Sequence, residues 1–279
     1  MKPRFAALLR INRSLVALIL FAMPVFADSG PRDVFLDDFD QGPSPLWGNE
    51  VGDWTTLGGV YFAQQPSNNP ATRTFLPLQY RNVDLEVDVN ALRDGGLFLR
   101  YNLDGDGVLL VLGGAGGGAH PPGGPGHDGL YWHTIVNENI TGTFGSVNGL
   151  GILDQDVHLR VVVCGARYSV YLNDADIAAT ELVTDQFSSG RIGLYDYSVQ
   201  SPQSFDNFVM VWTPASDGDM NCDTLVTVSD IGGFVLALTN PAQYAIDFPE
   251  CNVLNADVNG DGTVSVGDIG AFVTLLTGC

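Results

Sequence analysis

The stretch NVDLEVDVN at positions 82–90 decides the fold class of this chain. Its apolar side chains occupy every second position, at Val83, Leu85, Val87 and Val89. Its polar side chains occupy the positions between them, at Asp84, Glu86, Asp88 and Asn90. Because successive side chains of a strand point to opposite faces, the stretch predicts a β-strand with one buried and one solvated face.

Similar short runs surround this stretch on both sides, from Asp33 to about Thr213. About ten such runs, rich in Val, Leu, Phe and Tyr, alternate with turns rich in Gly, Asn and Asp. No apolar pattern with a 3.6-residue period extends through this part of the sequence. We therefore predict a mainly β fold over residues 28–213, an antiparallel jelly-roll sandwich of two sheets.

The charge of the chain excludes some classes of partner. The sequence has 32 Asp and Glu against 12 Lys and Arg, a formal net charge of −20. Such a chain repels phosphate backbones and anionic membrane surfaces, which excludes nucleic-acid binding. Its hydrophobic content of 45% is too high for a disordered acidic chain, so we expect a folded, turn-rich protein.

Residues 1–27 have the parts of a secretory signal peptide. A basic segment precedes an apolar segment at 15–26, and Val25 and Ala27 occupy the two positions that a signal peptidase reads. The apolar segment is shorter than a membrane-spanning helix, although an uncleaved anchor is the alternative. We expect cleavage before Asp28 and a secreted protein, extracellular or attached to a cell surface, with no membrane span.

Export makes disulfides possible, and the chain has four cysteines. Cys164 lies in an apolar, strand-like run, and we expect it to be a buried free thiol. Cys222 and Cys251 flank one short acidic segment and form the pair that we favour. Cys279, the last residue, is an alternative partner for either of them. Because the sequence has no CxxC motif, we expect no ligation of a soft metal.

The character of the sequence changes at Pro214, where a polar linker at 214–218 leads into an acidic tail at 219–279. The tail contains an internal repeat, since residues 219–240 align without gaps onto residues 257–278. Twelve of the twenty-two aligned positions are identical. We therefore predict a small, duplicated, α-helical domain after the sandwich.

Each repeat places oxygen-bearing side chains at positions 1, 3, 5 and 12 of a loop. Alternating ligands on a tight loop converge on one point, and a site of six to eight oxygens suits Ca²⁺ better than Mg²⁺. The carbonyl of position 7 and the side chain of position 9 complete the set. The predicted ligands of two calcium ions are Asp219, Asn221, Asp223, Leu225, Thr227 and Asp230 in the first loop, and Asp257, Asn259, Asp261, Thr263, Ser265 and Asp268 in the second.

The two loops differ at position 6. The second loop has Gly262 there, which permits a sharp reversal of the chain, whereas the first loop has Thr224. A positive φ at Thr224 would cost about 1–2 kcal/mol and weaken the first site. Asp-rich turns that bind no ion are the alternative to the calcium interpretation.

A helix is predicted after each loop. Apolar residues recur there with helical spacing, which indicates that each helix buries one face. The spacing is carried by Ile231, Phe234, Val235 and Leu238, and it is repeated by Ile269, Phe272, Val273 and Leu276. We expect Val264, at position 8, to face the core and couple the two loops. No amphipathic helix is predicted before either loop, although an ordinary EF-hand requires one.

On these motifs the segment at about 217–279 resembles a type I dockerin, a duplicated loop-and-helix module that binds calcium and docks onto cohesin domains. The resemblance implies two EF-hand-like calcium loops and a cohesin-type partner. In that family, positions 10 and 11 of each loop help to select the cohesin. These positions are Val228 and Ser229 in the first loop, and Val266 and Gly267 in the second.

The sandwich resembles the concanavalin A-like and laminin-G-like jelly rolls, including the 3-keto-disaccharide hydrolase-like group. The resemblance covers most of 33–213 and concerns architecture more than activity. The matching motifs are DDFD (37–40), GDWTTLGGVYF (52–62), NVDLEVDVN, GGLFLRYN and FDNFVMVW (205–212).

Two carboxylates on the polar face are weak candidates for catalysis. Glu86 and Asp88 resemble the ExDxE strand of laminarinase-like glycosidases, in which alternate carboxylates line a cleft. Residues two apart on a strand lie about 6.5–7 Å apart on one face, so the spacing permits this role. However, Asn90 replaces the second Glu of that motif and removes the acid/base. We therefore favour a solvated strand face and assign no catalytic residue.

A sugar-binding sandwich needs aromatic platforms and a few polar side chains. Each aromatic candidate can instead belong to the core. The candidates are Trp47, Trp54, Tyr61, Tyr101, Tyr131, Trp132 and Tyr195.

Two further clusters invite a metal interpretation. A third, structural cation is a weaker hypothesis at the two ends of the domain, near Asp37, Asp38, Asp40 and Asp206. A Gly- and Pro-rich loop at 113–129 carries or adjoins three histidines, His120, His127 and His133. We interpret the histidines as solvated, because neither their spacing nor the loop prearranges them.

The sequence as a whole predicts a secreted, glycan-associated protein, carbohydrate-binding or adhesive, attached through a calcium-dependent dockerin-like tail to a cohesin-bearing scaffold or surface. The alternative is a polysaccharide-degrading glycoside hydrolase with the sandwich as its catalytic domain. A third interpretation gives the sandwich a purely structural role.

Overall fold

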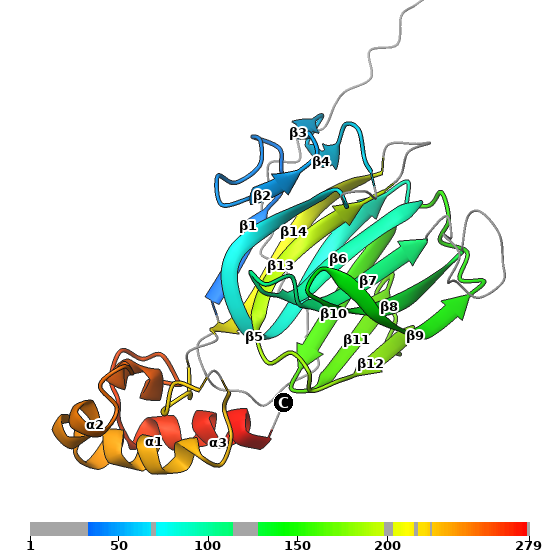
Figure 1. The fold of residues 1–279 in the computed structure, drawn as a ribbon. Coiled ribbons are helices and arrows are strands. Elements are labelled where there is room, and N and C mark those ends of the chain that lie inside the picture. The colour runs from blue at the N-terminus through cyan, green and yellow to red at the C-terminus, as the bar shows by residue number, and fades with distance from the viewer. Residues whose placement is uncertain are drawn as a thin grey trace, which may run out of the picture.

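The computed structural model of the protein describes residues 33–67, 71–113, 128–197, 203–214, 217–223 and 225–277. The predicted mainly β fold is confirmed, because the described residues form an antiparallel two-sheet sandwich followed by short helices. Figure 1 shows these helices at one end of the sandwich. The predicted signal peptide at 1–27, together with His120, His127, Thr224 and Cys279, lies outside the described residues.

Strand β5 (Arg73–Asn90) belongs to both sheets. Its first half pairs with β13 (Gly190–Asp196), and its second half pairs with β10 (Val157–Cys164). Figure 1 shows the strand bending strongly between the two halves. The position of each sheet is therefore fixed by one continuous strand.

The first sheet extends on both sides of the second half of β5, and its neighbouring strands are antiparallel. Its order is β12 (Thr180–Val183), β11 (Arg167–Leu172), β10, β5, β14 (Ser204–Pro214) and β1 (Asp33–Asp37). A hairpin of β3 (Trp54–Leu57) and β4 (Val60–Ala63) adjoins β14.

The second sheet extends from the first half of β5, again with antiparallel neighbours. Its order is β2 (Gly48–Val51), β5, β13, β6 (Asp94–Tyr101), β7 (Gly107–Gly113), β8 (Gly129–Val136) and β9 (Asn139–Asn148).

The main core lies between the sheets and confirms the alternation predicted at 82–90. Its four alternating apolar residues are all buried there, among side chains such as Leu97, Leu110 and Trp132. On the other face of the same strand Glu86, Asp88 and Asn90 remain partly exposed, but Asp84 is buried, so the prediction of a solvated face is wrong at this position.

The second sheet departs from the pattern of one buried and one solvated face. Every residue of β6 and β7 is buried. A second apolar cluster, which includes Phe75, Phe98 and Tyr101, covers the face of this sheet that points away from the main core. The continuous apolar run of β7, GVLLVLG, is typical of a strand buried on both faces.

The tail contains the two predicted helices, α1 (Asp230–Thr239) and α3 (Ile269–Thr277), one after each loop. The side chains of Phe234 and Phe272, which are equivalent positions of the repeat, stack with ring centroids 3.9 Å apart. Val264 packs against the same tail core, as predicted. Stacking of equivalent residues joins the two repeats into one small core.

The predicted apolar stripe of the first helix is wrong in part. Phe234 is buried, but Ile231 and Val235 are exposed, and Ile269 and Val273 repeat this in the second helix. The buried side of α1 consists instead of Asp230, Gly233, Phe234 and Ala237. Gly233 approaches Met220 so closely that a Cβ would lie 2.8 Å from the Met220 Cβ, so close packing at Gly233 sets this rotation.

The connector between the loops contains two short helices that the sequence pattern did not predict, α2 (Pro241–Asp247) and η1 (Val253–Ala256). A further 3₁₀ turn, η2 (Val266–Asp268), leads into α3. Pro241 starts α2, and the Asn240 side chain accepts a hydrogen bond from the backbone of Gln243. A seven-residue helix is too short to show a helical period in the sequence.

The disulfides match one prediction and overturn another. Cys222 and Cys251 are bonded, with Cα atoms 5.8 Å apart, which confirms the favoured pair. Cys164 is also disulfide-bonded, so the prediction of a free thiol is wrong. In the described part of the chain, no helix has the length and apolar content needed to cross a membrane.

The same substitution should destabilise the protein more at a buried leucine than at an exposed one. Leu85 is buried in the main core, whereas Leu57 on β3 is 74% exposed. We expect Leu85→Ala to lower the free energy of unfolding by about 2–5 kcal/mol, because it leaves a cavity. Leu57→Ala should change it by no more than about 0.5 kcal/mol. Denaturant titration of both variants measures the difference, and equal losses would contradict the assigned core.

Candidate functional site

The second acidic loop is folded by its own side chains. Asn259 Oδ1 accepts the backbone N–H of Asp261 at 2.9 Å, and Asp261 Oδ1 accepts that of Thr263 at 2.9 Å. Gly260 and Gly262 adopt positive φ values of 57° and 84°, which turn the chain sharply. The predicted side-chain ligands at positions 1, 3 and 5 are thereby held on one tight loop.

The first loop repeats this geometry. Asn221 Oδ1 accepts the backbone N–H of Asp223 at 3.0 Å, and Asp223 Oδ1 accepts that of Leu225 at 2.9 Å. Cys222 has a φ of 58°, nearly the same as Gly260 at the equivalent position. The sequence repeat is therefore a repeat of loop conformation as well.

The two position-12 carboxylates are fully buried and close their loops. Asp230 accepts backbone N–H groups of Met220 and Thr227, each at 2.8 Å. Asp268 accepts those of Asn259 at 3.0 Å and Ser265 at 2.8 Å. Each carboxylate oxygen has two lone pairs, so these bonds leave acceptor capacity.

The donor set of the second loop fits a hard cation. Asp257 Oδ2 accepts the N–H of Gly262 at 2.9 Å, but its Oδ1 is buried without a hydrogen-bond partner. A buried carboxylate oxygen of this kind is costly unless an ion or a donor satisfies it. In the described residues, no three Asp, Glu, His or Cys side chains are arranged to hold a metal ion. A calcium ion would therefore require the side chains of the loop to rearrange around one point.

Matching apolar surfaces flank the two loops. Val228 and Val266 at position 10 are 79% and 78% exposed. Ile231 and Ile269 are 43% and 45% exposed, and Val235 and Val273 are 50% and 48% exposed. Ser229 and Gly267 at position 11 are also exposed. Each repeat thus presents a similar apolar surface to solvent.

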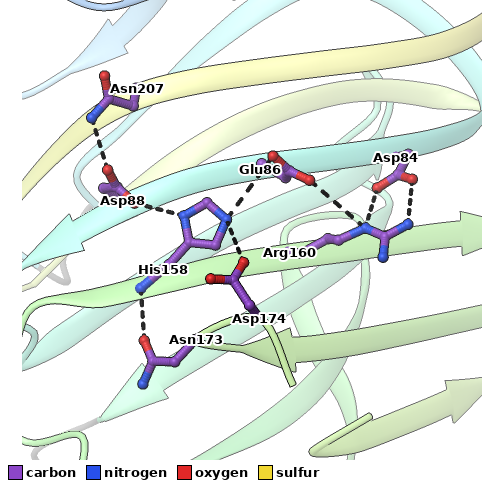
Figure 2. Close-up of polar contacts among 8 residues, drawn as sticks. All are labelled: Asp84, Glu86, Asp88, His158, Arg160, Asn173, Asp174 and Asn207. Carbon is purple, nitrogen blue, oxygen red and sulfur yellow. Dashed lines mark hydrogen bonds and ion pairs between the residues drawn. The ribbon is translucent and has the colours of Figure 1, made fainter. Parts of the chain in front are cut away.

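The two catalytic candidates lie in a row of ion pairs on the outer face of the first sheet (Figure 2). His158 Nδ1 lies 2.7 Å from Asp88 Oδ1, and Asn207 donates to the other Asp88 oxygen at 2.8 Å. Arg160 holds Asp84 through two hydrogen bonds of 2.8 and 2.7 Å. These bonds link β5 to β10 and β14.

Glu86 lies between the two basic side chains. Its carboxylate oxygens are 4.0 Å from His158 Nε2 and 3.9 Å from Arg160 Nε. Across the sheet, Arg160 is opposite Glu86 and His158 is opposite Asp88. Asn90, the residue that departs from the glycosidase motif, donates to Ser204 Oγ at 3.3 Å. Such pairing is typical of cross-strand stabilisation on a solvated face.

Most of the predicted aromatic platforms belong to the core. Trp47, Tyr61 and Trp132 are buried between the sheets, and Trp54 packs against them. The other three, Tyr101, Tyr131 and Tyr195, are buried in the second cluster, on the far face of the second sheet.

This second cluster, hereafter the aromatic face, also contains polar groups. Burial raises the pKa of Tyr131 and of Tyr195, and the nearby Asp94 carboxylate raises both further. The buried Arg191 guanidinium lies 4.8 Å from the centre of the Phe75 ring. Sequence reasoning missed Arg191, although the unbroken apolar run of β7, GVLLVLG, is the pattern of a strand that is covered on both faces.

His133 lies on β8, on the same side as Tyr131. It is buried, with Nδ1 2.9 Å from Thr143 Oγ1, so the prediction of a solvated histidine is wrong at this position. Thr143 lies opposite His133 in the β8–β9 ladder, and the His133 ring also packs edge-on against the Tyr131 ring, with centroids 5.1 Å apart.

Of the acidic residues at the domain ends, Asp37 has a clear structural role. Asp37 accepts hydrogen bonds from the backbone of Ser44 at 2.7 Å and from Trp47 Nε1 at 2.9 Å. Burial raises the pKa of Asp206, and the carboxylates of Asp88, Asp40 and Asp38 raise it further. Within the described residues, these carboxylates do not form a group that could hold a cation.

No protein-family model and no curated protein matches the chain. Several solved structures are similar to the sandwich at low sequence identity.

A carbohydrate-binding module, CBM66 from Bacillus subtilis, is 16% identical, with a TM-score of 0.47 over 58% of this chain and 93% of that chain. Bacillus licheniformis β-glucanase is 13% identical, with a TM-score of 0.44 over 64% of this chain and 97% of that chain. The VIP36 exoplasmic/lumenal domain, in a form bound to Ca²⁺ and Man3GlcNAc, is 10% identical, with a TM-score of 0.44 over 64% of this chain and 87% of that chain. These similarities concern the fold alone.

The row of ion pairs makes a prediction about stability. Arg160 pairs with Asp84, which is 8% exposed, whereas Arg167 pairs with Glu181, which is 42% exposed. We expect Arg160→Gln to lower the free energy of unfolding by about 1–3 kcal/mol, because it leaves a buried carboxylate without its charged partner. Arg167→Gln should cost less than about 1 kcal/mol. Urea denaturation compares the two, and a larger loss at Arg167 would refute a structural role for the row.

Proposed function

We propose that this protein is a secreted, glycan-associated protein that attaches to a cohesin-bearing scaffold or surface through a calcium-dependent, dockerin-like tail. The main support for the proposal is that the two repeats of the tail share the same loop conformation and present similar apolar surfaces. Its two loops have matching hydrogen bonds, and its two apolar surfaces have nearly equal exposures.

Two calcium ions are part of the proposal. The side chains of Asp219, Asn221, Asp223 and Asp230 would hold one ion, and those of Asp257, Asn259, Asp261 and Asp268 the other. The carbonyls of Leu225 and Thr263, together with Thr227 and Ser265, would complete the two shells. When bound, each ion would neutralise carboxylates that otherwise repel one another, because the sequence after Pro214 contains no Lys or Arg.

The partner surface is proposed at positions 10 and 11 of the loops. Val228 and Val266 are exposed apolar side chains, and Ser229 and Gly267 beside them are small. Small and apolar residues permit close packing against a protein partner and place no charge at the centre of the contact. The exposure of Ile231 and Ile269 extends each apolar surface along its helix.

A carbohydrate is the proposed ligand of the sandwich. Supporting it, the aromatic face combines tyrosine rings with the buried polar side chains of Asp94, His133 and Arg191. Aromatic rings beside a few placed polar groups are typical of ligand sites. The hydrolase alternative has less support, because Asp88 is engaged by His158 and Asn207 and Glu86 lies between His158 and Arg160.

Anchoring predicts binding that depends on calcium and on position 10. We expect the full chain to bind a type I cohesin in calcium and to lose this binding in EDTA. The double substitution Val228→Asp and Val266→Asp should weaken it about tenfold or more, because each carboxylate would be buried in an apolar contact. Surface plasmon resonance measures the affinities.

The matched control for anchoring is Val183→Asp, which changes a valine of the sandwich that is 66% exposed. It should leave cohesin binding unchanged. Binding that persists in EDTA, or no binding to any type I cohesin, would contradict the anchoring proposal.

Carbohydrate binding predicts a role for the aromatic face. On a glycan array we expect the full chain to bind at least one class of glycan. Tyr131→Phe with Tyr195→Phe should weaken that binding by about 3- to 10-fold, because two hydroxyl groups are lost while the rings remain. Tyr171→Phe, on β11 of the first sheet, is the control and should have no effect. A silent array would leave the structural role of the sandwich as the better explanation.

A further inference from the structure

Cys222 occupies an unusual place in the first acidic loop. It is position 4, between the predicted ligands Asn221 and Asp223, and its φ is 58°. At the equivalent position of the second loop, Gly260 has a φ of 57°. Position 4 of both loops thus adopts the same left-handed conformation, but only the second loop has a glycine at this position.

The left-handed conformation at position 4 is what brings the neighbouring side chains together. In both loops, the Asn at position 3 accepts the backbone N–H of the Asp at position 5, at 3.0 and 2.9 Å. The same pair is joined by a side-chain bond from Asn Nδ2 to Asp Oδ2, at 2.9 and 3.1 Å. A residue with a Cβ disfavours this conformation, so a restraint on position 4 would stabilise the first loop.

The disulfide is placed where it can act as such a restraint. Cys222 is bonded to Cys251, which packs against the tail core and whose N–H donates to the Phe248 carbonyl at 3.0 Å. One end of the bond is therefore fixed on the connector, and the other end lies inside the loop. The second loop has no such bond at Gly260 and does not need one, because glycine adopts positive φ readily.

We propose that the Cys222–Cys251 disulfide is a positioning element of the first calcium loop, and that it replaces there the glycine that shapes the second. The inference rests on the proposed binding of calcium. It assigns to the disulfide a role in ion affinity that is separate from its general effect on the stability of the tail.

The test measures calcium affinity loop by loop in the full chain by isothermal titration calorimetry. The double substitution Asp257→Ala with Asp261→Ala removes calcium binding at the second loop, so the measured heat reports calcium binding at the first loop. In this background, Cys222→Ser with Cys251→Ser should raise the calcium Kd about tenfold or more, because the left-handed turn loses its restraint. Cys222→Gly with Cys251→Ser also lacks the disulfide, but it should return the Kd to within about threefold of the parent.

A reciprocal variant leaves both disulfide cysteines in place. In a chain whose first loop is silenced by Asp219→Ala with Asp223→Ala, Gly260→Ser should raise the Kd of the second loop about tenfold. If the cysteine variants fail to fold, this measurement still tests the premise that position 4 must adopt a positive φ, and an unchanged Kd would overturn the inference.

The outcomes separate this inference from the proposed function. If the parent chain binds two calcium ions but the serine variant binds as tightly as the parent, the inference is wrong and calcium anchoring stands. A glycine variant as weak as the serine variant, or a second loop indifferent to Gly260→Ser, also overturns it. If the parent chain binds no calcium, the anchoring proposal and this inference fail together.

Discussion

The sandwich depends on β5 running through both of its sheets. A strand that pairs with β13 in its first half and β10 in its second cannot shift its register in one sheet without shifting it in the other. Near the bend, Arg100 of β6 is buried and donates to the carbonyls of Arg81 at 3.0 Å and Phe187 at 2.7 Å. These bonds satisfy backbone acceptors at the point where the ladder changes partner. The same strand positions Asp84, Glu86 and Asp88 on one sheet and Phe75 on the other.

Local patterns predicted the parts of the fold that local physics controls. The alternation from Val83 to Val89 predicted the core face of the strand correctly, and the other face is partly exposed except at Asp84, which is buried against Arg160. It gave no sign of the bend in β5, which arises from pairing with distant strands. The alternation could not identify the partners of the acidic side chains either, because His158 lies seventy residues after Asp88. For the same reason, the pattern could not tell that Tyr101, Tyr131 and Tyr195 share a face while Trp47 and Trp132 belong to the core.

In the tail the repeat was more informative than periodicity. Identity between the two repeats predicted equivalent helices, and the stacking of Phe234 on Phe272 shows how these residues meet. The helical spacing of Ile231 and Val235 predicted their burial wrongly, because rotation of α1 is set by the buried Asp230 and by close packing at Gly233. Hydrophobicity alone could not identify the buried side, since a buried carboxylate that caps backbone N–H groups occupies it.

The two repeats also meet different surroundings, which their sequences do not reveal. Leu225, Val226 and Thr227 of the first loop line one hollow together with Arg81 and Phe187 of the sandwich. Burial lowers the pKa of Arg81, while the carboxylates of Asp219 and Asp230 act in the opposite direction. A tail that has no Lys or Arg of its own therefore gains a positive charge from the sandwich beside its first loop. Because opposite charges attract, the Arg81 guanidinium contributes to the electrostatics of the first loop, and no Lys or Arg of the tail itself does this.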